Sequence, residues 1–211
     1  MSGVIPASPT LIGHHVRLES LARHHAAGLA AASAVDPSLY NLSPIPQGEA
    51  EALDYIDAAT ALRDAGEAVP YATVSIADGT VVGSTRFFNF DRWAWPQTSP
   101  HHSAHVLDGC EIGYTWLGAR AIRTPVNTEA KLLMLTHAFE VWNTLRVCFH
   151  TDARNERSAN ALARIGAKPE GLLRAHRMAA DFIPRDSLRF SITAAEWPEV
   201  KASLQRRLET T

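Results

Sequence analysis

The feature of this sequence that most constrains its fold is a hairpin pattern between residues 71 and 90. Two runs rich in β-branched and aromatic residues, YATVSI at 71–76 and TVVGSTRFFNF at 80–90, flank the pair Asp78-Gly79. Such a pair between two such runs is typical of a tight turn that joins antiparallel strands. The pattern therefore predicts antiparallel pairing within the chain and excludes a sheet built only from alternating parallel strands and helices.

The remaining elements follow from the spacing of apolar residues. Further strands are expected at 14–20, 110–117, 146–151, 171–179 and 185–193. Helices are expected at 21–33, 48–65, 125–142 and 156–165, and a last one begins near TAAE at 193–196, a capping-box pattern. This order predicts a mixed α/β fold with a central, largely antiparallel sheet of about seven strands, flanked by helices.

Length and composition predict an ordinary globular protein. The 211 residues, 46% of them hydrophobic, fit a single domain over 1–211. The formal net charge of −2 gives no reason to expect nucleic acid or a membrane surface as the partner. No apolar run is long enough to span a bilayer.

Two observations bear on the compartment. Residues 1–10, MSGVIPASPT, have no basic region followed by an apolar core, so we expect no signal peptide. Cys110 and Cys148, the only cysteines, each lie in an apolar run and are expected to be buried and reduced; a disulfide or redox pair is the alternative. A cytoplasmic protein is the default expectation.

The segment RTPVNTEAKLLML at 123–135 has the pattern of a helix start. Thr124 and Pro125 fit the N-cap and the first helical position. The next N–H groups, those of Val126, Asn127 and Thr128, are expected to be unpaired. Since the helix dipole adds partial positive charge, this start suits an anion such as a phosphate.

The surroundings of this helix start strengthen the hypothesis. Arg120 and Arg123 precede it and add full positive charges. The strand EIGYTWL at 111–117 runs directly into the same loop, and α/β folds often bind ligands where a strand ends and a helix begins. Another helix entry, at 152–167, places Asn155 and Ser158 three residues apart, where both are also good capping residues.

With these segments in place, the chain resembles the GNAT-fold N-acetyltransferases, in a subgroup similar to the ribosomal-protein N-terminal acetyltransferases. The resemblance covers about residues 10–210 and is carried by EIGYTWL with RTPVNTEAKLLMLTHAFE, by VCFHTDARNERSANALARIGAKPEG, and by the closing strand RDSLRFSIT. It implies a sheet splayed in the middle, acetyl-coenzyme A as donor and an amine as acceptor. The anion at the helix start would then be the cofactor pyrophosphate, bound by Arg123, Thr124, Val126, Asn127 and Thr128.

The resemblance also implies roles for other residues. A backbone N–H near Trp116 or Leu117 would stabilise the oxyanion, and Leu117 and Gly118 would pair with the pantetheine amides. Asn155 would hydrogen-bond the pantetheine arm, and Ser158 would donate a proton or a hydrogen bond to the departing thiolate.

This chain departs from the family at its phosphate loop. The family pattern is Q/R-x-x-G-x-G/A, whereas this chain has Ile122, Pro125 and Asn127 at the three defining positions. Glycines allow close backbone approach, and proline cannot donate an N–H. The departure bears on the affinity for the cofactor more than on the fold.

Acyl transfer to an amine also needs a group that accepts a proton. Glu111, on the strand before the loop, is our leading candidate for this general base; the alternative is a solvent-facing strand residue. Tyr114 is a second candidate, as an acid or a positioning group, with a buried aromatic as its alternative. His150 and His176, on other strands, are expected to be structural.

The remaining histidines and one long loop are further candidate sites. HHSAH at 101–105 and the pairs at 14–15 and 24–25 are expected to be solvated, with no metal bound, because the spacing is loose and no ligand set converges. The loop 91–109 is long enough to be functional. Its residues Trp93 and Trp95 would wall an acceptor pocket with Tyr40, form a homodimer contact, or belong to a disordered flap.

Two hypotheses about function follow. The first is an enzyme that transfers an acetyl group from acetyl-coenzyme A to a primary amine, a protein N-terminus or a small amine, by direct attack on the thioester. The second is a non-catalytic acyl-coenzyme A binding protein on the same fold, which the altered phosphate loop favours. Asn155, Ser158 and Glu111 favour the enzyme.

Overall fold

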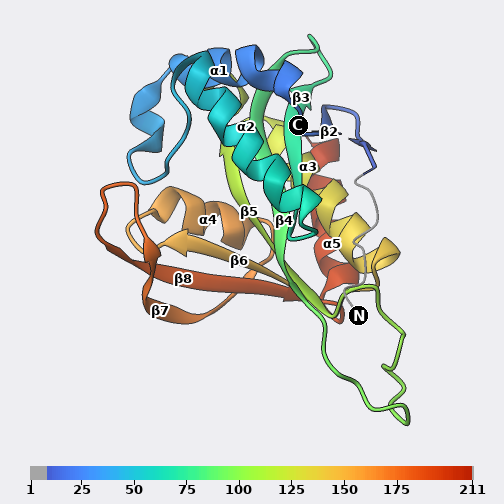
Figure 1. The fold of residues 1–211 in the computed structure, drawn as a ribbon. Coiled ribbons are helices and arrows are strands. Elements are labelled where there is room, and N and C mark those ends of the chain that lie inside the picture. Colours follow the sequence, from blue (N-terminus) through green and yellow to red (C-terminus); the bar gives the residue numbers. More distant parts are fainter. Residues whose placement is uncertain (1–8, 211) are drawn as a thin grey trace. The chain divides into compact units, whose positions relative to one another are not determined.

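The computed structural model describes residues 9–210. Residues 1–8, which make up most of the segment expected to lack a signal peptide, lie outside the described part. The described residues form two compact units, each assembled from separate stretches of the chain. Unit 1 takes residues 9–40, 45–88 and 113–133, and unit 2 takes 41–44, 89–112 and 134–210. Figure 1 labels the helices and strands of both units.

Unit 1 contains the N-terminal strands and the first helices. In chain order its elements are β1 (Leu11–Ile12), β2 (Val16–Ser20), η1 (Arg23–His25), α1 (Ala26–Ala34), η2 (Pro37–Tyr40), α2 (Gly48–Asp64), β3 (Ala68–Ser75), most of β4 (Val81–Asp91), the end of β5 (Gly109–Leu117), η3 (Ala119–Ala121) and most of α3 (Pro125–Thr136). The strands β1, β2, β3 and β4 pair antiparallel in that order. The predicted hairpin is therefore confirmed, and Gly79 adopts the positive φ of 69° that its turn requires.

The core of unit 1 forms where helices α1 and α2 pack together against the sheet. Helix α2 buries Ala52, Ile56 and Ala59, a spacing that places all three on one face. Its start is fixed by Glu51, whose carboxylate accepts the N–H of Gln47 at 2.8 Å. These residues pack with Leu29 of α1 and other buried side chains. Of the three apolar residues expected to face the core, Ile56 is buried and Leu53 is partly buried, whereas Leu62 is exposed.

Unit 2 contains the C-terminal half of the chain. Besides the ends of β4 and α3 and the start of β5, its elements are the π-helical turn η4 (His137–Val141), β6 (Arg146–Asp152), α4 (Glu156–Arg164), β7 (Lys168–Met178), β8 (Pro184–Thr193) and α5 (Trp197–Glu209). Strand β8 pairs antiparallel with β6 on one side and with β7 on the other. Figure 1 shows β7 and β8 as a long hairpin.

The strand order of the sheet is β1-β2-β3-β4-β5-β6-β8-β7. The pair β5–β6 is parallel, and its register covers Gly109–Glu111 of β5 against Arg146–Cys148 of β6 and no further in the described chain. This short pairing agrees with the expectation of a sheet splayed in the middle. The sheet has eight strands instead of about seven because β1, only two residues long, gives no periodic pattern.

The chain ends differ slightly from the sequence prediction. The capping-box pattern at 193–196 forms a turn before the helix: Glu196 Oε2 accepts the backbone N–H of Thr193 at 2.8 Å and its hydroxyl at 2.9 Å. Helix α5 begins after this turn, at Trp197, and buries Trp197, Val200 and Leu204. None of the helices in residues 9–210 is both long and apolar enough to cross a membrane.

Both cysteines are buried and free. Burial raises the pKa of the Cys110 thiol well above its usual value and that of Cys148 as well, which keeps both protonated at neutral pH. The expectation of two buried, reduced cysteines is confirmed.

Candidate active site

Helix α3 of unit 1 begins at Pro125, as the sequence predicted. The Thr124 hydroxyl donates to the carbonyl of Ala121 at 2.8 Å and accepts the N–H of Val126 over a long 3.4 Å. Thr124 is therefore the N-cap, and the expectation of an unpaired Val126 N–H is wrong. Arg123, just before the cap, has a positive φ of 62°, which is uncommon for a residue with a side chain.

Of the three backbone N–H groups expected to be available to an anion at this helix start, only one remains. Thr128 is the fourth helical residue, whose N–H a regular helix directs to the carbonyl of the N-cap, so it is not available to a ligand. Asn127 is the third, and no side chain among residues 9–210 accepts a hydrogen bond from its N–H. Arg120 and Arg123 are exposed and form no ion pair within the described chain. The start of α3 therefore presents one amide and two guanidinium groups.

The second turn of α3 carries a buried carboxylate that the sequence did not reveal. Glu129 accepts the backbone N–H groups of His14 at 2.8 Å, His15 at 2.7 Å and Val16 at 2.8 Å. A side chain at Gly13 would overlap the same carboxylate, because its Cβ would lie 2.3 Å from Cδ of Glu129. Glu129 thus fixes the turn between β1 and β2 on the helix.

The residues after β5 are largely engaged within unit 1. The Tyr40 hydroxyl donates to the carbonyl of Leu117 at 3.0 Å, and the Gly118 N–H donates to Val82 at 2.8 Å. Tyr40 also packs edge-on against the buried Trp116 ring. Tyr40 is therefore a core residue, and the idea that it walls an open acceptor pocket is not what the structure shows. The carbonyl of Gly118 in turn accepts the N–H of Ala121 at 2.9 Å.

Tyr114 is exposed, so the alternative of a buried aromatic is wrong. Half of its surface, 51%, is accessible, and its φ of 50° is in the left-handed region. Its ring covers the Arg86 guanidinium, with 4.0 Å between Cζ and the ring centroid, and contacts Phe88 edge-on. Non-glycine residues in this backbone conformation cluster at functional sites, which keeps Tyr114 a candidate.

Lys131 lies one helical turn beyond the cap region and is also buried. Its Nζ donates to the hydroxyls of Thr115 at 2.7 Å and Thr85 at 3.3 Å, and no carboxylate of the described chain is within ion-pair distance. Burial lowers the pKa of Lys131 to about 7. The lysine is thus close to neutral at physiological pH.

Glu111, at the start of β5 in unit 2, lies in a buried polar network. Its carboxylate accepts the Asn89 amide at 2.8 Å and Arg177 Nη2 at 3.0 Å, and the Nδ1 of His150 lies 2.9 Å away without hydrogen-bond alignment. We call these four residues the Glu111 cluster. Only 3% of Glu111 is exposed, so the alternative of a solvent-facing residue is wrong.

The cluster keeps Glu111 ionised. Burial raises the pKa of Glu111, but the contact with His150 and the charge of Arg177 outweigh burial, and the net pKa is below its usual value. The His176 ring lies 4.8 Å from that of His150, between centroids. Burial and the Arg177 charge lower the pKa of His176, so it is neutral at pH 7.

Asn155 and Ser158 lie at the start of α4, also in unit 2. Asn155 is the N-cap, and its Oδ1 accepts the backbone N–H of Ser158 at 3.0 Å. The capping role weighed from the sequence is therefore present. The Ser158 hydroxyl is half-buried and makes no hydrogen bond within the described residues, so it is available to donate.

The long loop after β4 is held in place by one buried residue. Asp108 accepts the backbone N–H of Trp93 and the indole N–H of Trp95, both at 2.6 Å. Within the loop, the rings of His101 and His105 stack, and His105 Nδ1 lies 2.6 Å from the carbonyl of Asn143. These two histidines are half-buried, not fully solvated as expected.

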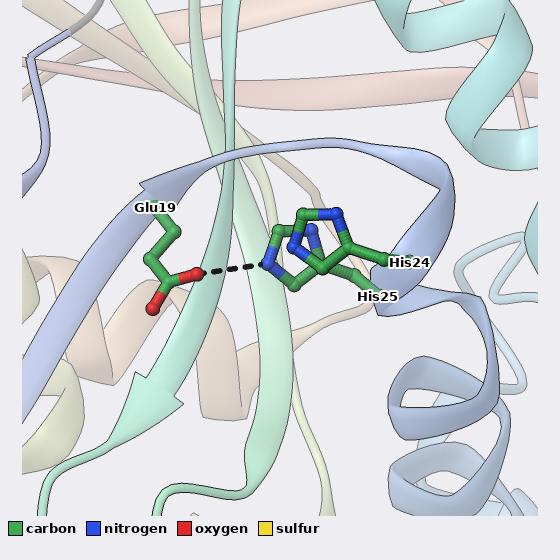
Figure 2. A group of neighbouring side chains, drawn as sticks. All are labelled: Glu19, His24 and His25. Carbon is green, nitrogen blue, oxygen red and sulfur yellow. Dashed lines mark hydrogen bonds and ion pairs between the residues drawn. The ribbon is translucent and has the colours of Figure 1, made fainter.

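Figure 2 shows a group of three residues that offers ligand atoms for a metal: Glu19, His24 and His25. His25 is buried, so the expectation of a solvated pair is wrong for it. Its Nε2 lies 3.1 Å from Glu19 Oε2, and its Nδ1 lies 3.1 Å from the backbone of Ala22. Because the Arg17 guanidinium binds the other oxygen of Glu19, a second cation is disfavoured there, and the group closes the turn into α1.

The comparisons with known proteins agree with this fold. Residues 15–168 match the model of the acetyltransferase (GNAT) domain family. The chain therefore belongs to the GNAT acetyltransferases, and the enzyme hypothesis is confirmed at the level of the family. No curated protein matches the sequence.

Solved structures extend the similarity over nearly the whole chain. A GCN5-related N-acetyltransferase from Brucella melitensis is 26% identical, with a TM-score of 0.80 over 95% of this chain and 86% of that one. A protein from T. thermophilus is 33% identical, with a TM-score of 0.78 over 97% of this chain and 100% of that one. Mycobacterium smegmatis RimJ, solved with CoA-disulfide, shares the fold at 22% identity, with a TM-score of 0.73 over 91% and 88%.

Proposed function

We propose that this protein transfers the acetyl group of acetyl-coenzyme A to a primary amine, either a protein N-terminus or a small amine. The observation that carries the proposal is the start of α3. There the Asn127 N–H and the exposed guanidinium groups of Arg120 and Arg123, which form no ion pair within residues 9–210, suit a pyrophosphate. The coenzyme would supply an activated acyl group as a thioester. The RimJ neighbour, whose structure contains CoA-disulfide, supports a coenzyme A derivative as the ligand.

The proton of the attacking amine would be accepted by the Glu111 cluster. Glu111 is ionised but enclosed by donors, so direct contact with an amine requires a change in the cluster. His150 and His176 continue from Glu111 toward the surface, and His176 is neutral at pH 7. We therefore assign His176 and His150 to proton transfer, with Glu111 stabilising the imidazolium that forms.

The departing thiolate needs a proton or a donor. Ser158 is the residue we assign to this step, because its hydroxyl has no partner in the described chain and its backbone is fixed by the Asn155 cap. The remaining roles follow the family resemblance. Asn155 would hydrogen-bond the pantetheine arm, Leu117 and Gly118 would pair with its amides, and a backbone N–H near Trp116 or Leu117 would stabilise the oxyanion.

Calorimetry with coenzyme A tests the helix start. We expect Arg120→Gln/Arg123→Gln to weaken binding about tenfold, the effect of losing one or two charge-assisted contacts. Arg164→Gln, a change at an exposed arginine of α4, is the control and should leave the affinity unchanged. Equal affinities of wild type and the double variant would remove this helix start from the site.

Release of free thiol over a panel of primary amines tests the transfer itself. We expect Ser158→Ala to lower kcat about tenfold while the affinity for coenzyme A changes less than about twofold, because the hydroxyl acts on the leaving group. An unchanged kcat would exclude Ser158 from the mechanism. Coenzyme A binding without thiol release from any amine would contradict acetyl transfer and leave a binding protein.

A further inference from the structure

Arg86 of β4 is a buried cation without a counter-charge. Only 4% of the residue is exposed. Its guanidinium is enclosed by two rings: Cζ lies 4.0 Å from the centroid of Tyr114 and 5.2 Å from that of Tyr55. Its side chain makes no ion pair or hydrogen bond within residues 9–210, and its Nε is buried without a partner. We call Arg86, Tyr55, Tyr114 and Phe88 the Arg86 cluster.

The nearby hydroxyls do not satisfy this guanidinium. Tyr55 donates its hydroxyl hydrogen to Ser84 at 3.1 Å, and Ser84 donates to the carbonyl of Tyr71 at 2.9 Å. A guanidinium remains charged at every physiological pH and carries five N–H donors. Buried charges in proteins are almost always paired, so a buried and unpaired Arg86 indicates a partner that the chain itself does not supply.

The cover of Arg86 is the exposed Tyr114 ring. Tyr114 holds a backbone conformation that few residues other than glycine adopt, and Phe88 contacts the edge of its ring. The Tyr114 ring therefore screens Arg86 from water on one side, while Tyr114 itself is exposed to solvent. An exposed aromatic over a buried guanidinium is an arrangement suited to a ligand that combines an anion with an organic body.

We propose that Arg86 binds a carboxylate carried by the amine acceptor, with Tyr114 contacting the rest of that acceptor. The proposal rests on the proposed function and narrows it to amines that bear a carboxylate. A planar guanidinium binds a planar carboxylate through two parallel hydrogen bonds, which matches an arginine held between aromatic rings better than a tetrahedral phosphate does. The coenzyme phosphates are assigned to the exposed Arg120 and Arg123.

Matched acceptors that differ only in charge test the proposal. The pairs are γ-aminobutyrate with its carboxamide, and the dipeptide amides Ala-Glu-NH2 and Ala-Gln-NH2. In the wild type we expect kcat/KM at least about tenfold higher for the carboxylate of a pair, with most of the difference in KM. In Arg86→Gln this ratio should fall to about two, while Arg164→Gln should retain the wild-type ratio. A wild-type ratio near one for both pairs would overturn the proposal.

Two further measurements keep the test decisive. Glutarate and glutaramide, which have no amine, are compared as ligands of the wild type by thermal shift and by tyrosine fluorescence; only glutarate should bind. This result stands even if Arg86→Gln fails to fold or no amine releases thiol, and absence of glutarate binding would overturn the proposal. The affinities of Arg86→Gln for coenzyme A and for dephospho-coenzyme A are then compared with those of the wild type. A loss of affinity for coenzyme A alone would assign Arg86 to the cofactor phosphate instead.

Discussion

The Glu111 cluster of unit 2 and the Arg86 cluster of unit 1 both bury a charged side chain on a strand, but they treat the charge differently. Glu111 is surrounded by a guanidinium, an amide and an imidazole, which together keep it ionised. The Arg86 guanidinium contacts the rings of Tyr114 and Tyr55 and forms no ion pair within residues 9–210. Burial by itself therefore does not identify a binding residue, whereas burial of a charged group without a counter-charge does.

Helix α3 repeats the contrast within two residues. Glu129 is buried against three backbone N–H groups, whereas Lys131 is buried against two hydroxyls only. Within residues 9–210, Glu129 and Glu111 thus have donors that match their charge, whereas Arg86 and Lys131 have no carboxylate partner. Four measurements test this contrast.

The largest effect on the free energy of unfolding is expected from Glu129→Ala. The substitution leaves the N–H groups of 14–16 buried without an acceptor, and we expect the free energy of unfolding to fall by about 4 kcal/mol. Urea denaturation measures the loss, with Glu67→Ala at an exposed position as the control, expected within about 0.5 kcal/mol of wild type. A loss below about 1 kcal/mol would show that these amides do not depend on the carboxylate.

The next effect concerns the pair Glu111–Arg177. A double-mutant cycle with Glu111→Gln and Arg177→Met should give a coupling energy of about 2 kcal/mol, because the carboxylate is buried. The exposed pair Glu140–Lys201, 2.7 Å apart, is the matched control and should give less than about 1 kcal/mol. Equal couplings would remove the distinction between the Glu111 cluster and an ordinary surface pair.

This coupling should also depend on pH. The pKa of Glu111 is lower in the folded than in the unfolded chain, so its stabilising contribution is present above the unfolded pKa and is lost as pH falls through the folded pKa. Urea denaturation from pH 7 down to acid pH should therefore show the wild type and Glu111→Gln converging in stability. Parallel curves would contradict the ionised state of Glu111.

The smallest effect, of opposite sign, is expected from Lys131→Met. The pKa of Lys131 is lowered to about 7, so the unfolded chain binds more protons between pH 7 and the usual lysine value, and wild-type stability rises with pH across that interval. Replacing the lysine removes the cost of its burial, and we expect a gain of about 1 kcal/mol at pH 7 that shrinks toward pH 10. A destabilised variant at pH 7 would show that the two threonine hydroxyls compensate the charge.

Much of the fold could be predicted from local patterns. The hairpin at 71–90 and the start of the helix at 125 each depend on residues close in sequence, and such local patterns report these elements directly. The TAAE turn shows the limit, because the same side-chain contacts form whether the helix begins at Ala194 or at Trp197. The predicted helices and strands are therefore present, whereas some of their first and last residues differ from the prediction.

The site was predicted less well, because its contacts join distant parts of the chain. Glu129 and Lys131 occupy a helix whose other residues suggest an ordinary amphipathic face, and nothing nearby reveals that both are buried. Arg86 lies in the apolar run TRFFNF, where a single arginine suggests a solvent-facing strand position. An arginine flanked by such residues is nevertheless a signal that could have prompted the question of its partner.

The hydrogen bonds between Glu129 and the turn at 14–16 have a consequence for synthesis of the protein. The carboxylate lies 113–115 residues after the amides that it binds. At ribosomal speeds of roughly 5–20 residues per second, the first turn of the polypeptide emerges on the order of ten seconds before its acceptor exists. During that interval the amides of 14–16 remain hydrated, so the beginning of the chain completes its native structure only after α3 has been translated.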